Sequence, residues 1–436
     1  MSEVSTPGRR SSFRRFLTAA VISSAGSSVT AVAMPILVVQ LLDATPFEVG
    51  VVNAAQFIPY AVLGLVAGVY VDRWRRKPIL VWASIGRAVT LGAVPLLWLA
   101  GLLHIWVLII VLLLYGSFSV FGFAAMQSLL PRLVPRGQLV QANARLDQAD
   151  AAATTLGPTI GGGLVGVLGA PLVIAVDAIS YLVDAALNSS LDVDEPRPTA
   201  PARNLIGEVR DGLKFTYRHR TLNPLAVSTH VWFLANGAAL TVLSLFALRS
   251  LGFSAYTYGL LLTTFGAASL LGASIAHTLA KRLGSGRAVV LARTLYPLAW
   301  ILVAFATDTT VGHVVLFAAL GLQGLAAGAE NANEMGYWQA LTPDELLGRV
   351  NAARRSVNRT MAAVGAVIAG LLVTVIGERP TLIGVIIVFA IAAAIVASRH
   401  CDTLKPSSDT NIPGLCPRRG AFTSRPSFVR FRDIGR

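Results

Sequence analysis

The segment LVPRGQLVQANARLDQADAAATTLGPTIGGGLVGVLG, residues 133–169, recurs as LTPDELLGRVNAARRSVNRTMAAVGAVIAGLLVTVIG, residues 341–377. The two copies share twelve identical residues at a constant separation of 208 positions, without a gap. The shared residues include Pro135/Pro343, Asn143/Asn351, Gly157/Gly365 and Gly169/Gly377. Two membrane helices with similar packing needs are one explanation. We favour a duplicated structural unit, the plan of many secondary transporters, in which two halves surround a site near the membrane midplane.

The composition places the chain in a membrane. Of its 436 residues, 54% are apolar and 13% are charged, whereas soluble domains carry about 25% charged residues. A bilayer-spanning helix needs about 20 apolar residues. Twelve segments meet that length, centred near residues 30, 60, 90, 116, 158, 181, 236, 268, 297, 321, 368 and 390.

The distribution of basic residues predicts the orientation of the spans. Bases are concentrated at the N-terminus, in alternate short loops and in the C-terminal tail, whereas the intervening turns are nearly free of them. Since cytoplasmic loops carry the excess of Lys and Arg, both termini are expected in the cytoplasm and the protein in the plasma (inner) membrane. The net charge of +14 therefore indicates contact with anionic inner-leaflet lipids and not with nucleic acid.

The spans divide six and six around a long polar segment. That segment contains NLIGEVRDGLKFTYRHR, whose helical periodicity predicts an amphipathic helix lying on the inner leaflet. The expected parts are an N-terminal arm (1–12), a first six-helix bundle (13–190), a linker with this helix (191–221), a second bundle (222–398) and a basic, disordered tail (399–436).

The stretch GVYVDRWRRKPIL, residues 68–80, separates the second and third spans. With Gly68, Asp72, Arg73, Arg76 and Lys77 in place it resembles the G-x-x-x-D-R-x-x-R-K signature of the major facilitator superfamily, although Arg75 replaces the second glycine. The resemblance implies a conformational latch in which Asp72 holds the start of the eleventh span, with Arg354 or Arg355. The alternative is a loop that only anchors the chain at the membrane surface.

A second resemblance lies in the fifth span. GPTIGG, with Gly157, Pro158, Gly161 and Gly162, resembles the end of the antiporter motif of exporters in that superfamily. Together with LLPRLVPRGQLVQANA and VDAISYLVDA, it is similar to the branch of drug:proton antiporters that contains macrolide-efflux proteins and the enterobactin exporter. The resemblance implies an all-α membrane protein with twelve transmembrane helices in two six-helix bundles, the major facilitator fold. Ordinary packing of small residues would also explain the motif.

Ionisable and polar residues inside spans are costly and therefore candidate functional residues. Gln323, Glu330 and Glu334 share one face of the tenth span. The resemblance places the first, fourth, seventh and tenth spans around the central cavity, so Glu330 is the leading candidate for proton coupling or for binding a cationic group. Further substrate or proton candidates are Ser27, His230 and Asn236.

Three charged residues lie inside spans of the first half. Arg87 is in the third span, and Asp177 and Asp184 are in the sixth. The depth of Arg87, about 12 Å from the start of its span, matches that of Asp184. A structural ion pair is favoured over a proton relay.

The chain lacks the G-x-x-x-x-G-K-[ST] phosphate-binding motif, metal-ligand spacings and a nucleophile triad. We therefore expect no enzyme, no cofactor, no metal and no direct use of ATP. The leading hypothesis is proton-coupled efflux of a hydrophobic or amphipathic small molecule, an antibiotic or secondary metabolite, by alternating access. The alternatives are a siderophore exporter of the same fold and a non-transporting membrane receptor.

Overall fold

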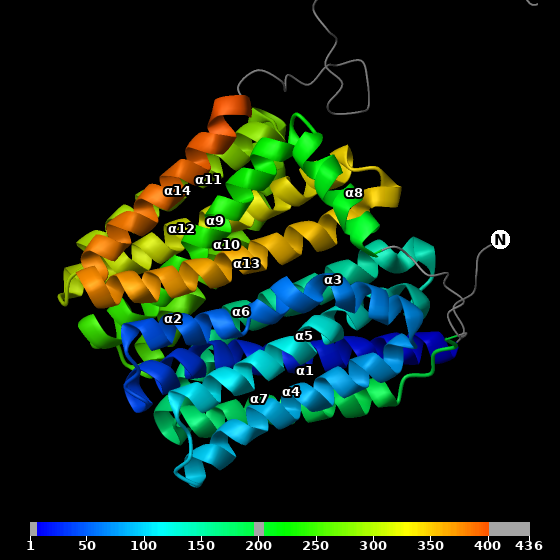
Figure 1. Cartoon of the computed structure of the whole chain (residues 1–436), viewed down its shortest axis with the longest axis horizontal. Coiled ribbons are helices and arrows are strands. Elements are labelled where there is room, and N and C mark those ends of the chain that lie inside the picture. Colours follow the sequence, from blue (N-terminus) through cyan, green and yellow to red (C-terminus); the bar gives the residue numbers. More distant parts are fainter. Residues whose placement is uncertain (1–6, 196–204, 401–436) are drawn as a thin grey trace, which may run out of the picture.

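The computed structural model describes residues 7–195 and 205–400, and within these ranges the regular structure is entirely helical. Twelve helical segments are long and apolar enough to cross a membrane, as the hydropathy pattern predicts. Six of these spans precede residue 190 and six follow residue 221, and the two sets form separate groups of helices (Figure 1). One end of the molecule carries the start of the first helix and the linker helix, and we call it the terminus end; the opposite end, with the turns at Asp43–Thr45 and Leu251–Ser254, is the turn end.

The first half runs from α1 to α7. Its elements are α1 (Pro7–Ile36) with the π-helical turn η1 (Leu37–Leu41), α2 (Pro46–Ala55), α3 (Ile58–Arg73), α4 (Arg76–Leu99), α5 (Ile105–Leu133), α6 (Leu139–Leu168) and α7 (Ala170–Ser189). The second predicted span is thus two helices that meet at Gln56 and Phe57. Pro59, in the first turn of α3, has no N–H to donate to an upstream carbonyl, which favours a helix boundary there.

The linker helix and the second half follow. They comprise α8 (Leu205–Arg218), α9 (Leu222–Leu245) with the π-helical turn η3 (Phe246–Ser250), α10 (Ala255–Leu283), α11 (Ser285–Phe305), α12 (Thr310–Leu341), α13 (Asp344–Ile376) and α14 (Glu378–His400). The linker helix packs on α13, where Gly212 lies against the backbone of Arg349. The side chains of Leu205, Ile206 and Val209, and the predicted tail after His400, lie outside the described residues.

The repeated segments form equivalent helices, α6 and α13. Both end at a glycine with positive φ, Gly169 at 81° and Gly377 at 86°, a conformation that costs glycine little because it has no Cβ. Gly157 packs α6 against Ser28 of α1, and Gly365 packs α13 against Leu234 of α9. Equivalent repeat positions therefore end the helix and pack it against the first helix of its own half.

The contact between the halves has the same symmetry. At Gly162 of α6, a Cβ would lie 3.0 Å from the Tyr256 Cα in the first turn of α10. At its repeat mate Gly370 of α13, a Cβ would lie 3.0 Å from the Gly50 Cα of α2. Glycine at these positions lets the backbones of opposite halves approach closely. We call these two contacts the glycine seams.

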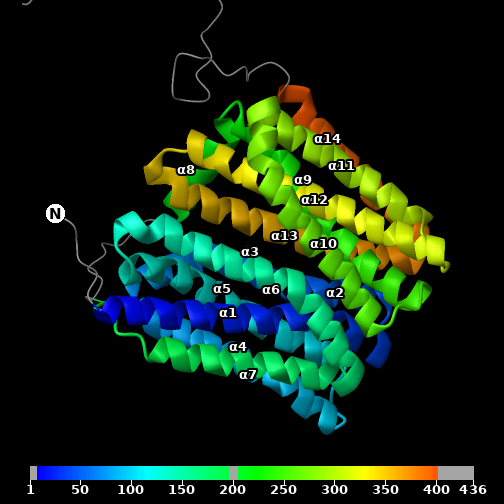
Figure 2. The ribbon, with the colours of Figure 1, turned by 180° about the vertical axis from the view of Figure 1, so that it is seen from behind.

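Polar contacts join the halves at the turn end. Arg249 donates to the Asp43 carboxylate and the Ala44 carbonyl, both at 3.0 Å. The Gln40 amide donates to the Phe253 carbonyl at 3.3 Å. Toward the terminus end, α6 and α10 diverge (Figure 2), and Asp147 and Asp150 of α6 are exposed. The halves are therefore held together mainly at the turn end and at mid-depth.

A matched pair of substitutions tests the glycine seams. Gly162→Val places a branched side chain against α10, and we expect overpacking to lower stability by about 1–3 kcal/mol. Gly163→Val is the control, because no heavy atom lies within 4 Å of a Cβ built there and both changes have the same intrinsic effect on the helix. The measurement is the melting temperature of each purified variant; equal melting temperatures would contradict a close seam.

Candidate functional site

A buried cluster of charges lies in the second half and joins α9, α11, α12 and α13. Its centre is Arg293 of α11, which is 1% exposed. The guanidinium donates to Glu330 Oε1 through Nε at 2.5 Å and to Glu334 Oε2 through Nη2 at 2.9 Å. It also donates to the hydroxyl groups of Ser228 and Thr229 on α9. One side chain thereby connects three helices, and we call this group the Arg293 cluster.

The two glutamates of the Arg293 cluster differ in their partners. Both oxygens of Glu334 accept hydrogen bonds: besides Arg293, the donors are Thr229 at 3.0 Å, Trp338 Nε1 at 3.1 Å and Arg354 at 3.3 Å. Such a carboxylate is stabilised in its ionised form. Glu330 accepts from Arg293 through Oε1, and its Oε2 is buried. The Tyr296 hydroxyl is the other group that contributes a hydrogen bond to this carboxyl group.

This arrangement separates two possible roles for the predicted acids. Glu334 is a fixed anion, whereas Glu330 has a second, buried oxygen that can take up a proton. Because Arg293 already neutralises Glu330, the carboxylate carries no uncompensated charge for a cationic ligand. Both predicted roles of Glu330, proton coupling and binding of a cationic group, stay predictions.

Arg293 itself was not predicted. It is the single charged residue within LARTLYPLAW, in the ninth span. The criterion that selects Arg87 in the third span, a lone base inside an apolar helix, selects Arg293 as well. Its partners lie 37, 41, 64 and 65 residues away in the sequence, so spacing alone does not reveal them.

The other predicted polar residues of the second half, His230, Gln323 and Asn236, do not belong to the Arg293 cluster. His230 receives or donates hydrogen bonds on both ring nitrogens, at 2.8 Å to Tyr217 of α8 and at 2.7 Å to Asn358 of α13. This chain of contacts ties the linker helix to the bundle, a structural role. Gln323 is buried and its Oε1 has no partner among the described residues, while Asn236 is half-buried on α9.

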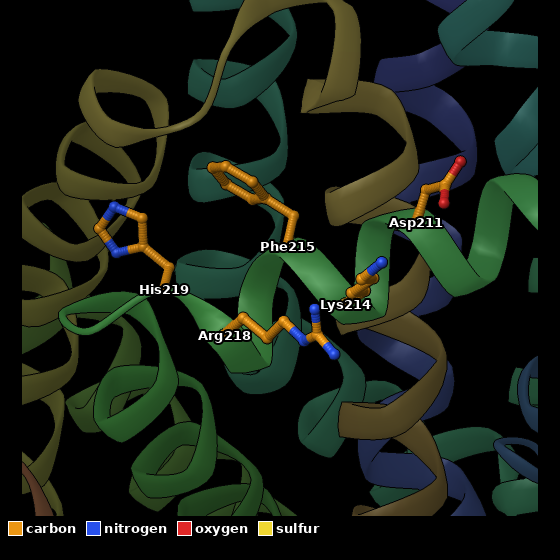
Figure 3. A pocket seen from close by; sticks show the side chains of 5 residues that line it. All are labelled: Asp211, Lys214, Phe215, Arg218 and His219. Atoms are coloured by element: carbon orange, nitrogen blue, oxygen red, sulfur yellow. The ribbon is translucent and has the colours of Figure 1, made fainter.

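A hollow on the surface of the protein lies at the linker helix. It has a volume of about 400 Å³ and is lined by Asp211, Lys214, Phe215, Arg218 and His219 (Figure 3). His219 Nδ1 accepts the N–H groups of Thr221 and Leu222 at 3.2 Å and so caps the start of α9. Burial lowers the pKa of His219, which keeps that nitrogen free to accept. The hollow is open and holds no cluster of acids.

The first half contains a smaller charged group. Arg87 Nη2 of α4 lies 3.8 Å from Asp184 Oδ2 of α7, with Ser84 hydrogen-bonded to both. The guanidinium also lies 4.2 Å from the ring centroid of Tyr181. The Tyr181 hydroxyl contacts Ser27 of α1 at 2.7 Å and Tyr115 of α5 at 2.9 Å. The predicted partner Asp184 is thus adjacent to Arg87, and the predicted candidate Ser27 belongs to the same network.

Asp177 does not join this ion pair. Its Oδ1 accepts from Ser180 at 3.0 Å, and its Oδ2 is buried without a hydrogen-bond partner among the described residues. The sequence stripe that groups Asp177 with Asp184 is real, but the two side chains sit two turns apart along α7 and meet different neighbours.

The start of α4, directly after the basic loop, is capped by a carboxylate. The backbone N–H groups of Arg76 and Lys77, the first two residues of α4, donate to the Glu195 carboxylate at 2.5 and 2.9 Å. The Lys77 ammonium donates to the Leu191 carbonyl at 2.6 Å. A carboxylate at a helix N-terminus satisfies free N–H groups and the helix dipole. Glu195 was not predicted, because it lies more than a hundred residues away.

The expected partners of Asp72 are engaged elsewhere. The side chains of Gly68 and Asp72 lie outside the described residues, and Arg73 is exposed. Arg354 binds Glu334, and the Arg355 guanidinium lies 3.8 Å above the Phe123 ring of α5. The neighbouring Ser356 donates to the Tyr60 carbonyl of α3, twelve residues before Asp72, or about 18 Å along the helix. The latch between Asp72 and the start of α13 therefore stays a prediction.

Within the described ranges, no group of three or more His, Cys, Asp or Glu side chains is placed to hold a metal ion. The Arg293 cluster has two acids, but Arg293 and Arg354 occupy the positions that a cation would need.

A double-mutant cycle tests the Arg293 cluster. Arg293→Gln removes the cation between two buried glutamates, and breaking a buried pair in this way costs about 3–5 kcal/mol. The double variant Arg293→Gln/Glu330→Gln removes one of the stranded charges and should recover part of that loss. Melting temperatures of the purified variants give the comparison, with Arg282→Gln, an exposed arginine at the end of α10, as the control. Strictly additive effects would contradict direct coupling.

Comparison with known proteins identifies the family. The family model described as transmembrane secretion effector, MFS_3, matches residues 2–411. The multidrug efflux pump Tap of Mycobacterium tuberculosis is 26% identical over 219 residues, which are 48% of this chain and 52% of that protein. The chain thus matches about half the length of Tap. The multi-drug resistance efflux pump PmrA of Streptococcus pneumoniae is 26% identical over 349 residues, 78% of this chain and 82% of PmrA.

Solved structures show the same fold at low identity. The nucleoside transporter NupG superposes with a TM-score of 0.72 at 12% identity, covering 89% of this chain and 98% of NupG. A bacterial homologue of the iron transporter ferroportin, in an inward-facing state, gives 0.70 at 17% identity, covering 89% and 98%. With its twelve spans, two six-helix bundles and matching family model, the chain belongs to the transmembrane secretion effector family of major facilitator superfamily transporters.

Proposed function

We propose that this transporter exports a hydrophobic or amphipathic small molecule across the plasma membrane in exchange for protons, by alternating access. The observation that carries the proton coupling is the asymmetry of the Arg293 cluster. Glu334 has four hydrogen-bond donors, two of them arginines, whereas Glu330 has one arginine, Arg293, and the neutral Tyr296 hydroxyl. A proton that enters the cluster therefore binds at Glu330.

Protonation of Glu330 changes the charge balance of the cluster. With Glu330 ionised, Arg293 and Arg354 balance Glu330 and Glu334; with Glu330 neutral, one positive charge is left over. Since an uncompensated buried charge is costly, protonation loosens the hold of Arg293 on α12 and favours another arrangement of α9, α11 and α12. A protein that converts proton binding into a choice between two arrangements has the coupling that an antiporter needs.

The contact between the halves supports alternating access. The glycine seams bring backbones together, and the side-chain hydrogen bonds beside them, such as Thr159–Thr263 and Asn53–Thr241, join neutral groups. The polar contacts at the turn end are few and partly exposed. For the Arg249–Asp43 pair, exposure limits the contribution to about 1 kcal/mol. Rocking of the halves breaks few strong interactions. The direction of transport and the drug-like substrate class are supported by the names of Tap and PmrA and by the GPTIGG motif.

Glu330→Gln tests the coupling assignment. Glutamine keeps an oxygen for Arg293 but takes up no proton, so we expect proton-driven efflux to fall about tenfold or more while downhill exchange of substrate continues. Accumulation of macrolides, cationic dyes and catecholate siderophores in efflux-deficient cells, with and without a protonophore, is the measurement. Glu378→Gln, the same chemical change at the turn end, is the control. Retained protonophore-sensitive efflux by Glu330→Gln would remove Glu330 from the mechanism.

Asp72→Asn tests the predicted latch separately. A carboxylate at a helix N-terminus contributes about 0.3–2 kcal/mol, which biases a two-state equilibrium without locking it. We expect weaker transport with normal membrane insertion. Asp194→Asn, an exposed acid at the same end of the first half, should transport normally. Equal transport by the two variants at equal membrane levels would rule out the latch.

A further inference from the structure

Two cationic residues of α13 face the other half and have no acidic partner in the described part of the chain. The Arg355 guanidinium lies 3.8 Å above the Phe123 ring of α5. The Arg359 guanidinium, one turn further along α13, lies 5.2 Å from the Phe57 ring centroid and 5.8 Å from that of Tyr60. All three rings belong to the first half. We call this group the α13 arginine pair.

The α13 arginine pair differs from three other arginines of the helical bundles, Arg87, Arg293 and Arg354. Arg87, Arg293 and Arg354 each lie within 4 Å of a carboxylate. Neither Arg355 nor Arg359 has an Asp or Glu oxygen at that distance among the described residues. Aromatic faces attract a cation but carry no net charge, so the pair remains a net positive charge inside the membrane-spanning region.

The exposure of Arg355 shows where this charge points. Arg355 is exposed and Arg359 is partly buried, although both lie well inside the span Leu346–Ile376. Because the Arg355 guanidinium rests on a ring of the opposite half, it lies where the two halves meet. The repeat mates of this pair on α6 are Asp147 and Ala151. The positive charge is therefore present on α13 only, and the equivalent positions of α6 do not share it.

We propose that the α13 arginine pair binds an anionic group, a carboxylate, sulfonate or phosphate, on the molecule that this transporter carries. Guanidinium groups form short, charge-assisted and often bidentate hydrogen bonds with such oxygens. Phe57, Tyr60 and Phe123 supply apolar surface beside the charge, which fits an aromatic or aliphatic body attached to the acid. This inference rests on the proposed function and narrows its substrate class to amphipathic organic anions.

Binding to the purified protein tests the site directly. N-dansyl-phenylalanine and N-dansyl-phenylalaninamide share one apolar body and differ only in the carboxylate. The seven tryptophans of the chain serve as energy-transfer donors to the dansyl group. We expect the carboxylate to bind about tenfold or more tightly than the amide. Equal affinities, tighter binding of the amide, or no binding of either compound would overturn the proposal.

Variants assign that preference to the pair. Arg359→Gln and Arg355→Gln should each reduce the carboxylate preference several-fold and leave binding of the amide unchanged, whereas Arg359→Lys, which keeps the charge, should retain part of it. Arg282→Gln is the control for loss of one positive charge. A full preference in the Arg355→Gln/Arg359→Gln double variant would place the anion elsewhere.

Two further measurements are needed. One distinguishes a lipid anion from a soluble anion, and the other distinguishes failure of this anion site from failure of the proposed export. If an anionic lipid headgroup occupies the pair, the carboxylate affinity falls in nanodiscs of phosphatidylglycerol relative to phosphatidylcholine, and it falls more in the unaltered protein than in the Arg355→Gln/Arg359→Gln variant. If a soluble anion occupies the pair, the two proteins show the same change, which the surface charge of the bilayer produces. Binding is measured without a proton gradient, so it does not depend on coupling. Loss of selectivity with intact protonophore-sensitive efflux refutes the site alone, and selective binding without efflux refutes the proposed export alone.

Discussion

A charge inside a membrane-spanning bundle must be compensated within the protein, and this requirement organises the interior of the molecule. Arg293 compensates two glutamates and receives support from two hydroxyl groups of α9. Arg87 does the same on a smaller scale with Asp184 in the first half. Helices α4 and α11 are equivalent third helices of their halves, so each half is held by an arginine from the same helix. Each arginine nevertheless pairs with a different helix, α7 in one half and α12 in the other.

Because Arg87 and Arg293 pair with different helices, they connect different parts of their halves. In the first half, the arginine joins the outer helices α4 and α7, and its second contact is with the Tyr181 ring. In the second half, the arginine reaches the tenth span, beside the helix that carries the α13 arginine pair. Proton binding at Glu330 and anion binding at Arg355 and Arg359 would thus act on adjacent helices, α12 and α13, which are linked through the Arg354–Glu334 pair. Coupling between the two events needs no long path.

The sequence predicts the fold well because its signals are local or repeated. Apolar length gives the twelve spans, and the duplicated segment places glycines at equivalent positions of α6 and α13. Glu330, Glu334, Arg87 and Asp184 were selected because ionisable groups are rare inside spans. Arg293 was not predicted as a site residue, although the same criterion applies to it. The Glu195 cap and the aromatic partners of the α13 arginine pair depend on side chains brought together only by folding. Asp177 was grouped with Arg87 by helical periodicity, which gives a shared face but not a shared neighbour.

The glycine seams have a consequence for how such a chain arises. Gly162 of the first half meets the start of α10, and Gly370 of the second half meets the start of α2. Each half gives one glycine and receives the other, so the interface is related by an approximate two-fold axis, as in an isologous homodimer. A single six-helix unit carrying both elements is complementary to a second copy of itself. Once two copies are joined in one chain, only the glycine seams have to keep this symmetry. Other equivalent positions of α6 and α13 can then acquire opposite charges, as Asp147 and Arg355 have done.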